Sequence, residues 1–135
     1  MVVKAFSGAK TKCMEHYVVP YLEQKPENII IHVGTNDLQC TDTASKIAGR
    51  IMNLALKCSQ HSKVFVSGIV KRGDNLNGKG ESVNDILQKS CISRNIPFIA
   101  NNNIELSDLN GSQLHLNKTG TLKLTSNFLE FISKV

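Results

Sequence analysis

The chain has 135 residues, 41% of them hydrophobic, and a formal net charge of +5. This length suits a single domain with a substantial core, and the composition excludes an intrinsically disordered chain. No apolar run approaches the roughly 20 residues that span a bilayer, and the N-terminal MVVKAFSGAK lacks the apolar segment of a secretory signal peptide. We therefore expect one domain over residues 1–135, intracellular and by default cytoplasmic, with no membrane contact.

The four cysteines predict neither a metal site nor a disulfide framework. Cys13, Cys40, Cys58 and Cys91 are widely spaced, and no CxxC or histidine-paired pattern occurs. We expect reduced thiols, with Cys13, Cys58 and Cys91 packing on apolar helix faces like small hydrophobic residues. Because nucleotide-binding glycine motifs are also absent, we expect no cofactor.

The positive charge leaves nucleic-acid binding open without favouring it. Basic residues are dispersed along the chain, and aromatic residues are not interleaved with them as a stacking platform for bases would require. A solvated basic surface accounts for the charge more simply.

Hydrophobic patterning predicts alternating strands and helices. A strand over residues 2–6 precedes a helix over residues 11–24, which Pro20 should kink. The second strand covers residues 28–33. The helix after it should begin at Asp42 or Thr43, because both side chains are good N-caps.

The second half of the chain continues this alternation. The helix after residue 43 carries an apolar stripe made of Ile47, Ile51, Leu54, Ala55 and Cys58. The elements that follow are a strand over residues 63–69, a polar loop over 71–80, a helix with Val83, Ile86, Leu87 and Cys91 on one face, a short strand over 97–100, a polar loop over 101–117, and a C-terminal helix marked by Leu124, Phe128, Phe131 and Ile132.

Strands that alternate with helices indicate a parallel sheet joined by right-handed crossovers. The predicted fold class is therefore α/β, a three-layer α/β/α sandwich of the flavodoxin-like kind. In such sheets, ligands and catalytic groups gather at the carboxyl ends of the strands. The apolar run at residues 29–33 ends at this edge, where it gives way abruptly to Gly34, Thr35, Asn36 and Asp37.

Three short motifs resemble the sequence blocks of the SGNH (GDSL-type) hydrolases. They are Gly8 after the first strand, residues 34–37 after the second, and His115 in LHLN ahead of the last helix. The chain is most similar to the esterase-like domain in the first open reading frame of some animal LINE-type retrotransposons, in which phrases like FSGA, HVGTNDL, VSGI and HLN occur in this order.

The resemblance implies an acyl-ester hydrolase with a small acyl-ester substrate. It implies that the backbone N–H of Gly8 and the side-chain amide of Asn36 stabilise the oxyanion, since such donors contribute about 3 to 4 kcal/mol each. It also implies that His115 is the general base, because imidazole can take up and return a proton near neutral pH. The other histidines lie within or beside regular elements.

At two points the sequence departs from the family pattern in residues that catalysis requires. The family's aspartate three residues before the histidine is replaced by Ser112, and Asp108 in the same loop is a weak substitute. The Gly-Asp-Ser block that carries the nucleophile, at the end of the family's first strand, does not occur in these 135 residues. Ser7 and Ser67 each follow a strand and precede a glycine, so they are the candidate substitutes.

Three interpretations remain open. In the first, the chain is an N-terminally truncated SGNH hydrolase-like domain that lacks the family's first strand and serine and is inactive. In the second, it is an esterase with a substitute nucleophile. In the third, it is a non-catalytic, flavodoxin-like binding module derived from a retroelement and possibly associated with RNA.

Overall fold

The computed structural model describes residues 9–134, and these residues form a parallel sheet covered by helices. The strands are β1 (Asn28–Ile31), β2 (Lys63–Ser67) and β3 (Phe98–Ile99), in the order β1-β2-β3. Ile29 pairs with Val64 and Val66 pairs with Phe98, both in parallel. The predicted strand over residues 2–6 lies outside the described residues.

Five α-helices and two short 3-10 helices occur in the described part of the chain. The α-helices are α1 (Thr11–Tyr17), α2 (Val19–Glu23), α3 (Ala44–Ser59), α4 (Asn77–Ser93) and α5 (Lys118–Ser133); the 3-10 helices are η1 (Asn36–Gln39) and η2 (Leu106–Asp108). None of these helices is long and apolar enough to cross a membrane.

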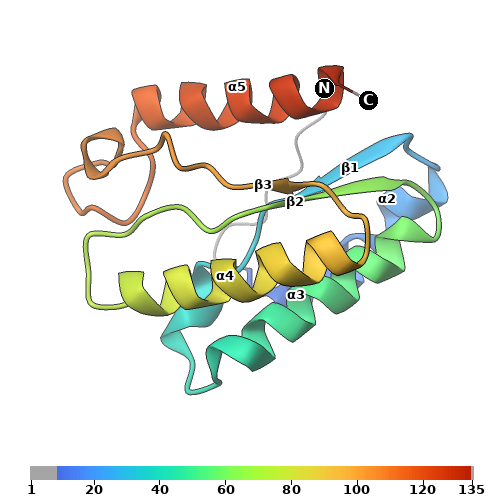
Figure 1. Cartoon of the computed structure of the whole chain (residues 1–135), viewed down its shortest axis with the longest axis horizontal. Coiled ribbons are helices and arrows are strands. Elements are labelled where there is room, and N and C mark those ends of the chain that lie inside the picture. The colour runs from blue at the N-terminus through green and yellow to red at the C-terminus, as the bar shows by residue number, and fades with distance from the viewer. Residues whose placement is uncertain (1–8, 135) are drawn as a thin grey trace.

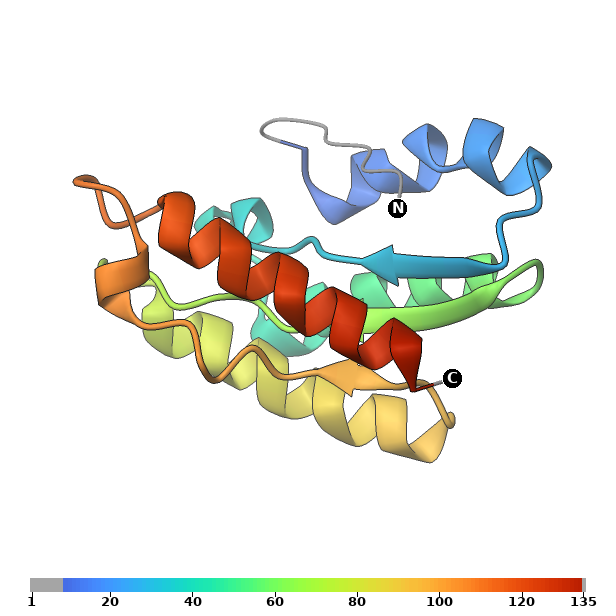
Figure 2. The same ribbon diagram turned by 90° about the horizontal axis from the view of Figure 1, so that it is seen from above.

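The elements form three layers. Helices α3 and α4 pack side by side on one face of the sheet, and α5 crosses the other face (Figures 1 and 2). Helices α1 and α2 lie beyond the outer edge of β1, where α1 contacts α3 (Figure 2). The predicted three-layer α/β fold is therefore confirmed.

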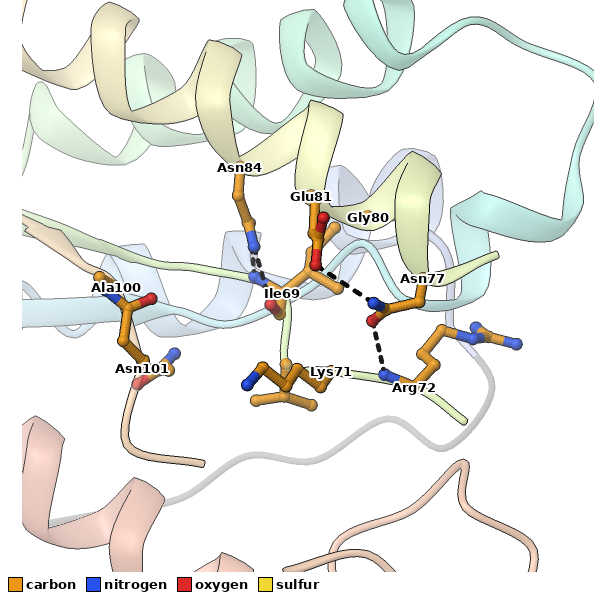
Figure 3. Close-up of a pocket in the computed structure, with 11 residues that line it drawn as sticks. Ile69, Lys71, Arg72, Asn77, Gly80, Glu81, Asn84, Ala100 and Asn101 are labelled. Carbon is orange, nitrogen blue, oxygen red and sulfur yellow. Dashed lines mark hydrogen bonds between the residues drawn. The ribbon is translucent and has the colours of Figure 1, made fainter. Parts of the chain in front are cut away.

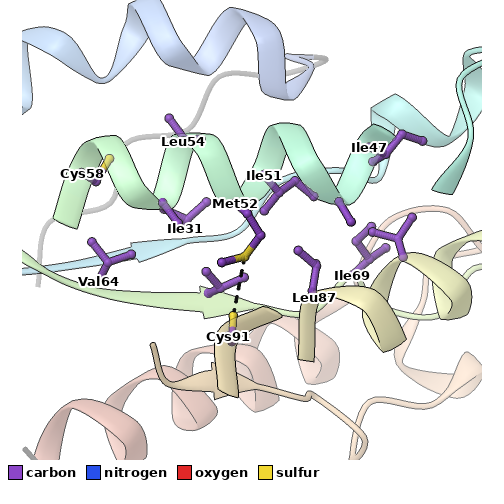
Figure 4. Packing of buried hydrophobic residues seen from close by; sticks show 14 of the residues in the cluster. Ile31, Ile47, Ile51, Met52, Leu54, Cys58, Val64, Ile69, Leu87 and Cys91 are labelled. Carbon is purple, nitrogen blue, oxygen red and sulfur yellow. Dashed lines mark hydrogen bonds between the residues drawn. The ribbon is translucent and has the colours of Figure 1, made fainter. Parts of the chain in front are cut away.

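The main core lies between the sheet and the pair α3 and α4 (Figure 4). The predicted stripe of α3 is buried, with Ile47, Ala55 and Cys58 at 0% exposure. Desolvation raises the pKa of the Cys91 thiol to about 11, and its sulfur lies 3.8 Å from the Met52 sulfur. Fully burying a valine, leucine, isoleucine or methionine side chain stabilises a fold by about 1.5 to 3 kcal/mol. Because most of the buried side chains of this kind belong to this cluster, it provides most of the hydrophobic stabilisation of the described residues.

Several local predictions are confirmed. The first helix breaks after Tyr17, and Pro20 lies in the first turn of α2, the place where a missing N–H costs least. Thr43 is the N-cap of α3, and its side chain accepts a hydrogen bond of 3.2 Å from the Lys46 backbone N–H.

Two local predictions are wrong. The polar loop predicted up to residue 80 ends earlier, because α4 begins at Asn77 and includes Gly78 and Gly80. A Cβ at Gly80 would lie 3.3 Å from Leu38, so this glycine lets α4 approach η1 closely. Cys13 is exposed on α1 instead of packed on an apolar face, since α1 lies at the margin of the fold.

Substitution of Gly34 should destabilise the fold. This glycine has a φ of +121°, and a Cβ there would lie 2.9 Å from Ile69 Cδ1. We expect Gly34→Ala to lower the free energy of unfolding by about 1 to 3 kcal/mol in urea denaturation. Gly49→Ala is the matched control, because nothing lies within 4 Å of its Cβ in α3. A loss that is equal in both variants would contradict this account of Gly34.

Candidate active site

The loop after β1 ties together several elements at the carboxyl edge of the sheet. The Asn36 amide donates to the Ala9 carbonyl at 3.2 Å. The Asp37 carboxylate is buried, and it accepts hydrogen bonds from the Thr11 backbone N–H at 2.9 Å and from the Thr11 hydroxyl at 3.2 Å. Asp37 therefore fixes the start of α1, and Asn36 fixes Ala9, which precedes this helix.

Arg72 links this loop to the loop after β2. Its guanidinium donates to the Thr35 carbonyl at 2.9 Å and binds both carboxylate oxygens of Asp74, at 3.0 and 2.7 Å. This bidentate hydrogen bonding lowers the pKa of Asp74. Arg72 is only 6% exposed, so its charge is neutralised within the protein.

The loop that carries His115 reaches the same edge. The Gly73 N–H donates to the Gln113 carbonyl at 2.8 Å, which joins the loop after β2 to the segment before α5. The His115 imidazole is exposed, and its backbone carbonyl accepts from the Asn110 N–H at 2.7 Å. The structure thus brings the loops of Asn36 and His115 to one edge of the sheet. Within residues 9–134, no hydrogen bond joins these two side chains.

The residues considered as partners of His115 make other contacts. The Ser112 hydroxyl donates to the Asn110 side chain at 2.6 Å. Asp108 is buried and accepts from the Glu105 N–H at 2.9 Å and from Lys123 Nζ at 2.8 Å; these bonds lower its pKa, that with Glu105 most. Within the described residues, neither side chain is hydrogen-bonded to His115. Ser7 and Gly8 lie outside the described residues.

A small cavity opens between the loops after β2 and β3 and the start of α4 (Figure 3). Its volume is about 100 Å³, and its polar lining includes Lys71, Asn77 and Glu81. The side chain of Asn84 closes its inner wall by pairing with both backbone groups of Ile69, each at 2.8 Å. Small-molecule sites span about 300 to 1,000 Å³, so this cavity suits a few water molecules better than an ester.

A histidine and a serine that sequence reasoning did not pair are in contact. His32 Nδ1 lies 2.8 Å from the Ser67 hydroxyl, which also accepts from the Asn101 amide at 2.8 Å. Asn127 on α5 donates to Asn101 at 3.0 Å and thereby orients its amide. No motif in the sequence marks this pair. It depends on the strand register, which pairs Ile31 with Val66 and so puts His32 opposite Ser67.

The contact between His32 and Ser67 fits either tautomer of the neutral ring. The Ser67 oxygen accepts from the Asn101 amide and has a second lone pair, so His32 Nδ1 can either donate to that oxygen or accept from the hydroxyl. His32 is exposed at one edge, yet the surrounding protein desolvates its ring and lowers its pKa to about 4.

Residues 9–134 contain no group of three or more histidine, cysteine, aspartate or glutamate side chains that could hold a metal ion. The Thr35 hydroxyl is buried without a hydrogen-bond partner among the described residues.

Solved structures share this fold at low sequence identity. A member of the lipolytic protein G-D-S-L family from Veillonella parvula matches with a TM-score of 0.83 and 16% identity, over 95% of this chain and 77% of that chain. A GDSL-like lipase from Bacteroides thetaiotaomicron matches with a TM-score of 0.86 and 16% identity, over 97% of this chain and 74% of that one. This chain has the GDSL hydrolase fold.

An acetylxylan esterase from Geobacillus stearothermophilus also has a structure similar to that of this chain. A catalytic mutant of it matches with a TM-score of 0.80 and 16% identity, over 96% of this chain and 70% of that chain. Catalytic mutants of that esterase replace a serine, a histidine, and an aspartate three positions before the histidine. In this chain Ser112 stands three positions before His115. No family model matches the sequence, and no curated protein matches it significantly.

His32 should make stability depend on pH between 6.5 and about 4. The folded state keeps the ring neutral down to about pH 4, whereas the unfolded chain takes up a proton near 6.5, the ordinary pKa of histidine. Because the unfolded state binds more protons in this window, the free energy of unfolding should fall as the pH is lowered through it. Urea denaturation across this range should show a smaller decrease for His32→Asn, and an unchanged decrease would contradict the assignment.

Proposed function

We propose that this chain carries the general base and part of the oxyanion hole of an acyl-ester hydrolase, without the nucleophilic serine. The observation that supports this proposal is the pair of hydrogen bonds that joins the three loops. Arg72 binds the Thr35 carbonyl at 2.9 Å, and the Gly73 N–H binds the Gln113 carbonyl at 2.8 Å. These bonds keep the segments of Asn36 and His115 at the carboxyl edge, where such chemistry occurs in this class of fold.

The proposed roles follow from hydrogen-bonding capacity. The Asn36 amide nitrogen carries two hydrogens, and its bond to Ala9 uses one, so the other can be donated to an oxyanion. The exposed His115 imidazole can exchange protons with a serine hydroxyl brought next to it. In this proposal the Gly8 backbone N–H is the second oxyanion donor and a small acyl ester is the substrate.

Ser67 is a poor substitute nucleophile in spite of its histidine neighbour. It is only 2% exposed, and its hydroxyl oxygen is already hydrogen-bonded to His32 and Asn101. A general base works best when its pKa lies near the working pH, and a pKa of about 4 makes His32 a weak base at neutral pH. The Ser67–His32 pair therefore fits a positioning contact between β1 and β2 better than a catalytic pair.

We further propose, on the order of the phrases FSGA, HVGTNDL, VSGI and HLN, that the domain derives from the first open reading frame of a LINE-type retrotransposon. The sequence of the genomic region on both sides of the coding segment tests this origin. Reverse-transcriptase coding sequence downstream is expected, and a flanking region with no retroelement sequence would contradict the proposal.

The 135-residue chain should be inactive on short acyl esters. Donors and a base without a nucleophile leave at most a modest enhancement over water. We expect no turnover of p-nitrophenyl acetate above a His115→Ala control, and no labelling by a fluorophosphonate probe. Labelling that disappears in Ser67→Ala would contradict the proposal, because it would identify Ser67 as the nucleophile.

A chimera tests the proposed roles directly. The segment of the Veillonella parvula protein that bears its G-D-S-L motif would be joined ahead of Met1. We expect this chimera to hydrolyse p-nitrophenyl acetate and to lose activity with His115→Ala. Asn36→Ala should lower kcat by roughly 10²- to 10³-fold, the usual cost of one oxyanion donor. A folded chimera whose activity is unaffected by both substitutions would refute the assigned roles.

A further inference from the structure

The chain contains two asparagine–glycine pairs, and the structure puts them in different surroundings. Asn77 and Gly78 begin α4, whereas Asn110 and Gly111 lie in the loop between η2 and α5. Asparagine is one of the chemically labile residues of proteins. A glycine after it increases this lability, because a residue without a Cβ lets its backbone nitrogen approach the preceding side chain. One chain therefore shows how local structure affects the same chemistry at two sites.

Asn110 begins an exposed turn. The Gln113 N–H donates to the Asn110 carbonyl at 2.9 Å, and this bond closes the turn. Asn110, Gly111 and Ser112 are all exposed, and their loop lies beyond the N-terminal end of α5 (Figures 1 and 2). Nothing lies within 4 Å of a Cβ built at Gly111. The backbone at Gly111 is therefore open to solvent and free of neighbours that would prevent it from rearranging.

Two donors are directed at the side-chain oxygen of Asn110. The Ser112 backbone N–H donates to it at 3.2 Å and the Ser112 hydroxyl at 2.6 Å. When a nucleophile attacks the Asn110 Cγ, negative charge develops on this oxygen, and these donors stabilise it as donors in an oxyanion hole do. Within residues 9–134, the Asn110 amide nitrogen donates no hydrogen bond, so no contact there retains the group that has to leave.

The side-chain amide of Asn77 is fixed at both ends. Its oxygen accepts from the Arg72 N–H at 3.0 Å, and its nitrogen donates to Glu81 at 3.2 Å (Figure 3). Asn77 is also the first residue of α4, so helical dihedral angles determine where the Gly78 nitrogen lies. Reacting atoms have to be about 3 to 3.5 Å apart and aligned, and a backbone fixed in a helix cannot turn to meet this requirement.

We propose that Asn110 is a site of spontaneous deamidation, which loosens the loop that carries His115. The Gly111 nitrogen loses its proton to a base in solution and attacks the Asn110 Cγ, which forms a succinimide ring. The bond between Cγ and the side-chain nitrogen breaks, and this nitrogen leaves as ammonia. One water molecule then opens the ring at either carbonyl, giving aspartate or isoaspartate at position 110. The net reaction consumes one water and releases one ammonia, and it does not depend on the proposed hydrolase chemistry.

The isoaspartate product changes the loop most, because it adds a methylene group to the backbone. The turn that Gln113 closes on residue 110 would lose its geometry. Gln113 also supplies the carbonyl that the Gly73 N–H binds at 2.8 Å. Deamidation would therefore weaken the link between the loop after β2 and the segment before α5.

The test follows the full 135-residue chain during incubation at mildly alkaline pH. Digestion under acidic conditions and peptide mass spectrometry would measure conversion at Asn110 and at Asn77, and fragmentation spectra would distinguish isoaspartate from aspartate. We expect conversion at Asn110 to be at least about tenfold faster than at Asn77. Gly111→Ala should slow it at least about tenfold, because a Cβ obstructs the attacking nitrogen. Gly78→Ala is the matched control and should not change it, since a Cβ there also meets nothing within 4 Å.

Two further measurements test the role of Ser112 and the effect on the loop. Ser112→Ala removes one donor to the Asn110 oxygen and should slow conversion at least about threefold. The Gly73 amide should exchange its hydrogen at least about tenfold faster in the isoaspartate form than in fresh protein, since its link to Gln113 is weakened. Asn110→Asp adds the charge without lengthening the backbone, and it should change this exchange rate by no more than about twofold.

Specific results would overturn each part of the proposal. Equal rates at Asn110 and Asn77, or a rate at Asn110 that Gly111→Ala does not lower, would overturn the assignment of the site. An unchanged rate in Ser112→Ala would overturn the role of its donors. Unchanged exchange of the Gly73 amide in the isoaspartate form would overturn the loosening of the loop. Circular dichroism of each variant verifies that a change in rate reflects the turn and not misfolding.

Discussion

The arrangement of the loops at the carboxyl edge of the sheet depends on the hydrogen bonds of the Arg72 guanidinium. The loops after β1 and β2 and the segment before α5 share no regular secondary structure, so side chains must fix their relative positions. Arg72 supplies a planar set of donors that a lysine could not reproduce, with two bonds to Asp74 and one to the Thr35 carbonyl. The adjacent Gly73 then extends the connection to Gln113 through its backbone. Any chemistry at this edge relies on this short sequence of bonds.

Two faces of the same sheet are stabilised in different ways. The face under α3 and α4 is a dense apolar layer, with Val64 and Val66 at 4% and 0% exposure. The face under α5 combines apolar residues with a chain of amides, in which Asn101 and Asn127 connect Ser67 to the last helix. Only Gly120 of α5 is fully buried, so this helix is held partly by hydrogen bonds that specify its position. Because the contact with α5 depends on these side-chain hydrogen bonds, polar residues gather at the ends of β2 and β3.

Periodic features of the fold could be predicted from the sequence, and features that depend on distant partners could not. The stripe from Ile47 to Cys58 and the Thr43 cap are local signals, and the structure contains both. The start of α4 could not be predicted, because glycines such as Gly78 and Gly80 are typical of loops. The reason for a glycine at position 80 is its close approach to Leu38, which is distant in the sequence. The sequence also predicted that the GTND motif directly follows a strand, and it follows β1 in the structure. That Asp37 caps α1 could not be predicted, since Thr11 is 26 residues away.

The burial of Cys91 has a practical consequence for following the core over time. Its thiol is 0% exposed and remains protonated far above neutral pH, because desolvation raises its pKa to about 11. Thiolate, not thiol, reacts with alkylating reagents, so Cys91 is chemically silent while α4 stays docked on α3. Exposed Cys13 reacts in the native protein and marks the background rate. The ratio of the two alkylation rates therefore reports how often the helix pair separates, with no substitution introduced into the protein.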